Sequence, residues 1–271
     1  MSLDRRTLLR AALGGAVASA YQMSPAEATG RRRTVFVAGD STAATYATAD
    51  VPRAGWGQAL HVFLRPEMTV ENAALSGASS KSFADLGRLD RILAAIGPGD
   101  VLLVSFAHND EKTEDPARYT EPWTTFQDYL RLYLDGARAR KARPILVTPV
   151  ERRRFRADGT PYLSHGEYPD SMRALAEATR TPLIDLTASS FALWSALGPE
   201  ATKDHFLWLD PGEEPNYPDG AADNTHFQAH GAIEVARLVA AGVPGRDRCA
   251  LRDPDIPDDV LTWPPTRPAE S

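Results

Sequence analysis

The chain alternates between short continuous apolar runs and longer stretches in which apolar residues recur every three or four positions. The runs predict buried β-strands, and they occupy residues 34–39, 68–72, 100–106, 144–150 and 182–186. The spaced stretches predict amphipathic helices, one that ends near residue 66 and others at 82–96, 124–141, 169–179, 189–197 and 228–241. Strands that alternate with helices in this order predict an α/β fold, a three-layer α/β/α sandwich with a five-stranded parallel sheet.

One long stretch, residues 199–224, has neither periodicity and is rich in Pro, Gly, Asp and Glu. We expect it to form a long loop before the last helix. The tail that follows Cys249 is rich in proline and is expected to wrap the surface. No internal repeat or linker interrupts the pattern, and 271 residues suit one α/β domain, so we expect residues 29–271 to form a single domain.

Residues 1–28 carry a different signal. Arg5 and Arg6 precede leucines and a weakly apolar stretch that is too short to anchor the chain in a bilayer, and small residues follow at 18–20 and 26–28. This arrangement resembles a bacterial twin-arginine (Tat) signal peptide; a frayed amphipathic N-terminus is the alternative. We therefore expect the Tat export machinery to deliver the chain to the periplasm or the medium, with cleavage at one of the two small-residue sites.

Composition and charge narrow the class of protein. Hydrophobic residues make up 43% and charged residues 24%, as in an ordinary soluble globule. The net charge of −6 disfavours nucleic acid and anionic lipid as partners. The single cysteine, Cys249, excludes an intramolecular disulfide and a cysteine-based metal site. Because the sequence shows no other membrane-spanning stretch, metal-ligand spacing or phosphate-binding glycine loop, we expect no stable membrane anchor, metal or cofactor. We also expect the protein to be a monomer.

Candidate reactive residues gather where the strands are expected to end. Ser41 follows the first strand, Gly77 the second and Asn109 the third, whereas Asp223 and His226 precede the last helix. The carboxyl ends of parallel strands meet at the edge where such sheets bind ligands. Serine ester hydrolysis needs a nucleophile, a base, a group that orients the base and donors for the oxyanion. Each residue alone has an ordinary explanation as a turn or helix-capping residue, so it is the set that indicates an esterase.

Four short motifs occur in order along the chain, namely Gly-Asp-Ser-Thr at 39–42, Gly77, His-Asn-Asp at 108–110 and Asp-Asn-Thr-His at 223–226. In this order they resemble the four blocks of the SGNH (GDSL) hydrolase superfamily. Within this superfamily, the chain most resembles the rhamnogalacturonan acetylesterases, because it also has Gly-Trp-Gly around Trp56 and Thr-Pro-Val at 148–150. The resemblance covers most of residues 35–241 and implies the flavodoxin-like sheet of these hydrolases.

The resemblance also implies a role for each residue. Ser41 would attack the ester carbonyl, His226 would take its proton and later protonate the leaving alcohol, and Asp223 would hold the imidazole tautomer. The oxyanion hole would consist of the backbone N–H groups of Ser41 and Gly77 and the side-chain amide of Asn109.

One residue departs from the family pattern, because Ala107 stands where these hydrolases have a glycine before His-Asn-Asp. We expect the added methyl group to narrow the acyl pocket or to shift Asn109, which favours small acyl groups such as acetyl. If Ala107 must adopt a positive φ, it is strained.

Four arginines within residues 152–156 follow the fourth strand. We hypothesise that Arg152 and Arg154 pair with uronate carboxylates of pectin, because a planar guanidinium suits a carboxylate; a solvated run of charge is the alternative. Trp56 either stacks on a sugar or packs in the core. The lack of an apolar lid disfavours long-chain lipids.

The sequence therefore predicts a serine esterase that acts through an acyl-enzyme on O-acetyl esters of a plant cell-wall polysaccharide, pectic rhamnogalacturonan before others. Another SGNH activity, such as a xylan acetylesterase, an arylesterase or a lipase, is the nearest alternative. A non-catalytic carbohydrate-binding relative is an alternative from another class.

Overall fold

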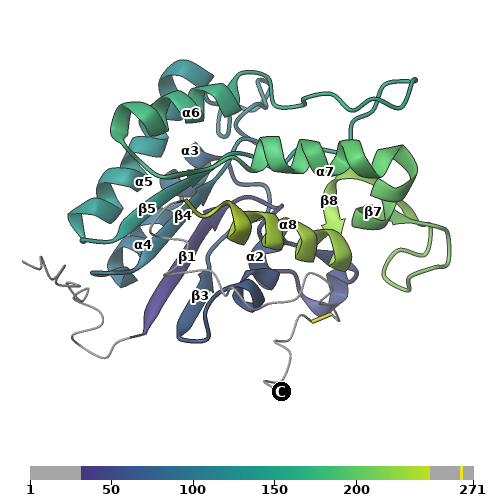
Figure 1. Cartoon of the computed structure of the whole chain (residues 1–271), viewed down its shortest axis with the longest axis horizontal. Helices are drawn as coiled ribbons and strands as arrows, with labels where there is room; N and C mark the ends of the chain where they lie inside the picture. Colours follow the sequence, from purple (N-terminus) through teal and green to yellow (C-terminus); the bar gives the residue numbers. More distant parts are fainter. Residues whose placement is uncertain (1–31, 245–262, 265–271) are drawn as a thin grey trace, which may run out of the picture.

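The computed structural model describes residues 32–244 and 263–264, and its centre is a five-stranded parallel sheet (Figure 1). The strand order is β3–β1–β4–β5–β6, and every neighbouring pair is parallel. The strands are β1 (Arg33–Gly39), β3 (Met68–Asn72), β4 (Val101–Ser105), β5 (Arg143–Val147) and β6 (Leu183–Ile184). The predicted signal peptide and the tail after Cys249 lie outside the described residues, apart from the pair 263–264.

Helices cover both faces of this sheet. Successive residues of a strand point to opposite faces, so Val35 and Val37 of β1 join one hydrophobic cluster while Phe36 and Ala38 join the other. The first cluster lies against α2 (Trp56–Ala59), α7 (Leu186–Ala201) and α8 (Ala229–Gly242). The second lies against α3 (Ser80–Asp85), α4 (Arg88–Ala95), α5 (Gln127–Ala139) and α6 (Tyr168–Thr179). The expected α/β/α sandwich is therefore confirmed.

Shorter turns of helix connect these elements. They are η1 (Thr48–Asp50), η2 (Leu60–Phe63), the π-helical η3 (Pro122–Phe126) and η4 (Thr202–His205). None of the helices in the described part of the chain combines the length and the apolar character that a bilayer crossing requires.

A second, smaller sheet corrects the expectation of one long loop over residues 199–224. Its antiparallel strands β2 (Arg53–Ala54), β8 (Ala221–Gln228) and β7 (Phe206–Leu209) pair in that order. Periodicity did not reveal β8, because its residues are mostly half-buried and its first five, Ala-Ala-Asp-Asn-Thr, have no apolar alternation. Asp223 and His226 therefore lie on a strand rather than in a loop.

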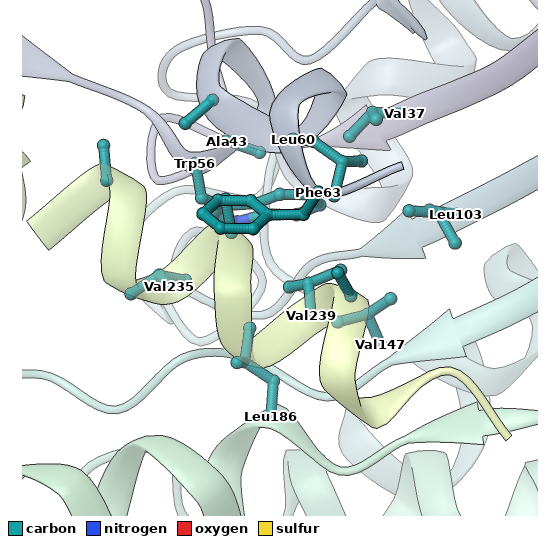
Figure 2. Close-up of a cluster of buried hydrophobic side chains, with 14 of the residues drawn as sticks. Val37, Ala43, Trp56, Leu60, Phe63, Leu103, Val147, Leu186, Val235 and Val239 are labelled. Carbon is teal, nitrogen blue, oxygen red and sulfur yellow. The ribbon is translucent and has the colours of Figure 1, made fainter. Parts of the chain in front are cut away.

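Trp56 lies in the core, so the suggestion that it stacks on a sugar is wrong. Its side chain, at the start of α2, is fully buried against α8 (Figure 2), beside Leu60, Val235 and Val239. The neighbouring glycine, Gly57, lets α2 approach the turn after β1, since a Cβ there would meet the Ala43 backbone oxygen at 2.5 Å. The indole thus contributes apolar area to the core.

Trp56→Ala is expected to lower the free energy of unfolding by about 3–5 kcal/mol, the usual cost of truncating a large buried aromatic residue. Urea denaturation of the purified variant measures this change. Trp123→Ala is the matched control, since Trp123 is 44% exposed and its loss should cost far less. A Trp56→Ala protein with unchanged stability and a raised KM for polysaccharide would restore the sugar-stacking role.

Candidate active site

The turn after β1 presents Ser41 at the carboxyl edge of the parallel sheet. Asp40 fixes this turn, since its Oδ1 accepts the Thr42 N–H at 2.9 Å and the Thr42 hydroxyl at 2.7 Å. Burial raises the pKa of Asp40, and the bonds from Thr42 act in the opposite direction. The Tyr46 hydroxyl donates to the Ser41 carbonyl at 2.8 Å. Both the main chain and the hydroxyl of Ser41 are thus held at the ligand-binding edge.

The structure brings Ser41, His226 and Asp223 into one hydrogen-bonded chain. Ser41 Oγ lies 2.9 Å from His226 Nε2, although 185 positions separate the two residues. On the other side of the ring, His226 Nδ1 lies 2.6 Å from Asp223 Oδ2. With Nδ1–H donating to the carboxylate, Nε2 is left to accept the serine proton. The geometry fits a nucleophile, a base and an orienting acid.

Asp223 remains ionised in this arrangement. Burial acts to raise its pKa, but bonds from the His226 ring and from the backbone N–H groups of Thr225 and His226, together with the charge of His226, lower the pKa to about 2. A carboxylate that keeps its charge can stabilise the imidazolium that forms when His226 accepts a proton.

A bulge in β8 explains how residues three apart on a strand act on one site. Trp208 of β7 pairs with Ala222 and Phe206 pairs with Phe227, so residues 223–226 leave the ladder opposite a single residue of β7. Bulges re-aim side chains near active sites. Asp223 stabilises the bulge itself, because its Oδ1 accepts two backbone N–H groups within it.

Two residues that sequence reasoning did not assign hold this bulge from outside. The Arg153 backbone N–H donates to the Asn224 carbonyl at 2.9 Å, and its guanidinium donates to Asn224 Oδ1 at 3.1 Å. The Trp208 indole N–H reaches the same Oδ1 at 3.1 Å, and the Arg153 guanidinium lies 4.6 Å from the centre of the indole ring. Sequence gives no signal for contacts between residues as far apart as Arg153 and Asn224.

The loops that carry the other two expected oxyanion donors lie side by side. Gly77 follows β3 with a φ of 79°, a conformation that favours glycine. Asn109 follows β4, is buried, and donates from Nδ2 to the Ala78 carbonyl at 2.9 Å. Asp110 joins the loops a second time, since its carboxylate accepts the Ser80 N–H at 3.0 Å. Burial raises the pKa of Asp110 to about 7, although bonds from Ser80 and Thr120 oppose this rise.

The structure accommodates the departure at Ala107. Its φ of 158° is positive, the condition under which we expected strain, although the value borders the extended region. The methyl group is fully buried and belongs to the cluster on the α3–α6 face of the sheet.

The arginines after β5 have separate surroundings, and Arg152 corrects our expectation. Its guanidinium forms an ion pair with Glu111 and donates to the Ser164 carbonyl at 3.3 Å, and only 13% of its side chain is exposed. An arginine that is buried and already paired does not bind a substrate carboxylate. Arg154 is exposed, and its contact with substrate stays a prediction. Within the described residues, no group of three or more His, Cys, Asp or Glu side chains could hold a metal ion.

Comparison with known proteins gives a consistent result. The model of the GDSL-like Lipase/Acylhydrolase family matches residues 37–232. Rhamnogalacturonan acetylesterase RhgT of Bacillus subtilis (strain 168) is 48% identical over 209 residues, which cover 77% of this chain and 88% of that protein. The probable rhamnogalacturonan acetylesterase YesY of the same organism is 39% identical over 212 residues, 77% of this chain and 91% of that one. The crystal structure of B. subtilis YxiM matches with a TM-score of 0.64 and 31% identity over 78% of this chain and 56% of that chain.

Asp223→Asn is expected to lower stability near neutral pH, because it removes a carboxylate that the fold keeps ionised. The folded-state pKa of about 2 lies below the ordinary 3.8, so the stabilising contribution is complete above 3.8 and is lost as the pH falls through 2. The difference in unfolding free energy between wild type and variant should therefore shrink as the pH falls from about 4 towards 2. Urea titrations at fixed pH measure this difference.

Asp219→Asn, which changes an exposed carboxylate in the preceding loop, is the control for loss of negative charge. A stability difference for Asp223→Asn that persists unchanged to the lowest pH would contradict the depressed pKa.

Proposed function

Because this chain belongs to the GDSL-like lipase/acylhydrolase family and is a carboxylic ester hydrolase, we propose that it is a serine esterase. It removes O-acetyl groups from a plant cell-wall polysaccharide, and pectic rhamnogalacturonan is the substrate we favour. The observation that carries the proposal is the hydrogen-bonded chain from Ser41 through His226 to Asp223. The same chain of bonds disfavours a non-catalytic carbohydrate-binding role. The choice of acetyl ester and polysaccharide is supported by the two relatives with rhamnogalacturonan acetylesterase names, whose lengths this chain largely covers.

The proposed reaction begins with attack of Ser41 Oγ on the ester carbonyl carbon while His226 Nε2 takes the serine proton. The oxyanion that forms would accept hydrogen bonds from the N–H groups of Ser41 and Gly77 and from the Asn109 amide, and one such donor is typically worth about 3 kcal/mol. When the tetrahedral intermediate collapses, His226 gives its proton to the leaving sugar hydroxyl and an acetyl group remains on Ser41. Water activated by His226 then releases acetate and restores the serine.

We also propose that the Tat machinery exports the protein, so that it meets its polymeric substrate outside the cytoplasm. The support is the twin arginine at residues 5 and 6 ahead of a weakly apolar stretch, all outside the described residues. Replacement of both arginines by lysine should retain esterase activity in the cytoplasm of the producing cell. Undiminished activity in the periplasm or medium would contradict Tat export.

Ser41→Ala is expected to reduce acetate release from acetylated rhamnogalacturonan by about 10⁴-fold or more, because it removes the hydroxyl that would form the acyl-enzyme. Acetate is measured enzymatically on the polysaccharide and on p-nitrophenyl acetate in parallel. Ser195→Ala, which removes an exposed hydroxyl on α7, is the control and should match wild type. If the wild type acts on p-nitrophenyl acetate but not on the polysaccharide, the esterase function stands and the proposed substrate is rejected. If Ser41→Ala is as active as the wild type, the role of Ser41 as nucleophile is rejected.

A further inference from the structure

Arg53 lies on the strand next to the one that carries the catalytic acid and base. It belongs to β2, which pairs with β8 so that Arg53 faces Gln228 and Ala54 faces Phe227. Phe227 directly follows His226, so the short strand β2 flanks the base on the side opposite β7. Arg53 therefore lies on the strand beside His226, although no sequence motif or spacing had marked it as a site residue.

One aromatic ring separates the Arg53 guanidinium from the nucleophile. The guanidinium carbon lies 4.6 Å from the centre of the Tyr46 ring, and the Tyr46 hydroxyl donates to the Ser41 carbonyl at 2.8 Å. The ring positions the cation through its negative face. We therefore expect that, when a substrate ester is bound at Ser41, the esterified sugar or the next one lies near Arg53.

The charge of Arg53 has no carboxylate partner within 4 Å in the part of the chain that the structure describes, and its buried Nε has no hydrogen-bond acceptor there. Three other arginines near the site are engaged. Arg152 pairs with Glu111, Arg118 pairs with Asp115, and Arg153 donates to Asn224. Folding has partly desolvated the Arg53 guanidinium and left it without an anion. It is therefore suited to bind an anionic group of a ligand.

We propose that Arg53 binds the carboxylate of a uronic acid in the substrate and thereby selects acidic over neutral acetylated polysaccharides. This inference rests on the proposed esterase function. The planar guanidinium can donate two parallel hydrogen bonds to a carboxylate, which fixes the sugar as well as attracting it. Arg53 is thus a specificity-determining residue, and it replaces Arg152 in the role that we first expected of the arginine run.

The test compares kcat/KM on an acidic polymer, acetylated rhamnogalacturonan, with kcat/KM on a neutral one, acetylated xylan. Arg53→Gln should lower the ratio of acidic to neutral activity by about 10- to 100-fold, the range for loss of a charged hydrogen-bonded pair. The change should appear mainly in KM. Arg53→Lys keeps the charge and the contact with Tyr46 but loses the planar fork. It should lower the ratio less than Arg53→Gln, and it serves as a control for a folding defect in that variant.

Two further variants make the outcome specific. Arg131→Gln removes an exposed charge from α5 and should leave the ratio unchanged. Arg154→Gln tests the rival arginine. If the ratio falls with Arg154→Gln and not with Arg53→Gln, the assignment to Arg53 is overturned. If no arginine variant changes the ratio while wild type still releases acetate from rhamnogalacturonan, the carboxylate site is rejected and the esterase function stands.

A binding measurement separates this proposal from catalysis. In a Ser41→Ala background, calorimetry with acetylated rhamnogalacturonan oligomers should show affinity that falls with added salt, and Arg53→Gln should weaken the affinity and flatten its salt dependence. Equal affinity with and without Arg53 would overturn the proposal. A wild-type enzyme that releases no acetate from the acidic polymer would instead reject the proposed function, and the Arg53 site with it.

Discussion

The hydrogen bond between Ser41 Oγ and His226 Nε2 joins two separate sheets, and the rest of the site depends on it. The parallel sheet supplies the serine, and the small antiparallel sheet supplies the histidine and Asp223. The bond forms only because β8 leaves its ladder between Ala222 and Phe227. A misplacement of about 1 Å between reacting groups can cost about 100-fold in rate, so we expect the shape of this bulge to constrain the proposed reaction as well as the fold.

The surroundings of the bulge explain why charged residues after β5 turn inward. Arg153 and Trp208 hold Asn224, the residue directly after Asp223. Arg152 pairs with Glu111, which follows the loop of Asn109. The arginine run therefore connects the loop after β5 both to β8 and to the expected oxyanion loop. Arg154 remains exposed. Arg53, far away in sequence, has no carboxylate within 4 Å in the part of the chain that the structure describes.

Much of this architecture could be predicted from the sequence, for physical reasons. Strands buried on both faces, such as 101–105, read as continuous apolar runs, and the residues after them are where parallel sheets place their chemistry. Ser41, Asp223 and His226 could be found because their motifs occur in a fixed order. Their geometry could not, because β8 is a half-buried strand whose polar first half has no periodicity.

Two errors have the same origin, since both concern what a side chain meets across the fold. Trp56 follows a loop next to the expected site, yet it packs against α8, far along the chain. The partner of Arg152, Glu111, is 41 positions away and is one of many acids in the sequence. Residue type and local spacing carry no information about such partners, which depend on how the layers pack.

We propose that Ser41 becomes acylated with the help of His226 and Asp223. Rapid quenching after mixing with p-nitrophenyl acetate, followed by peptide mass spectrometry, tests it most directly. We expect a burst of p-nitrophenol and a transient acetyl group on the peptide that contains Ser41, both abolished by His226→Ala. An acetyl group on another residue, or steady turnover by a variant without Ser41, would contradict it.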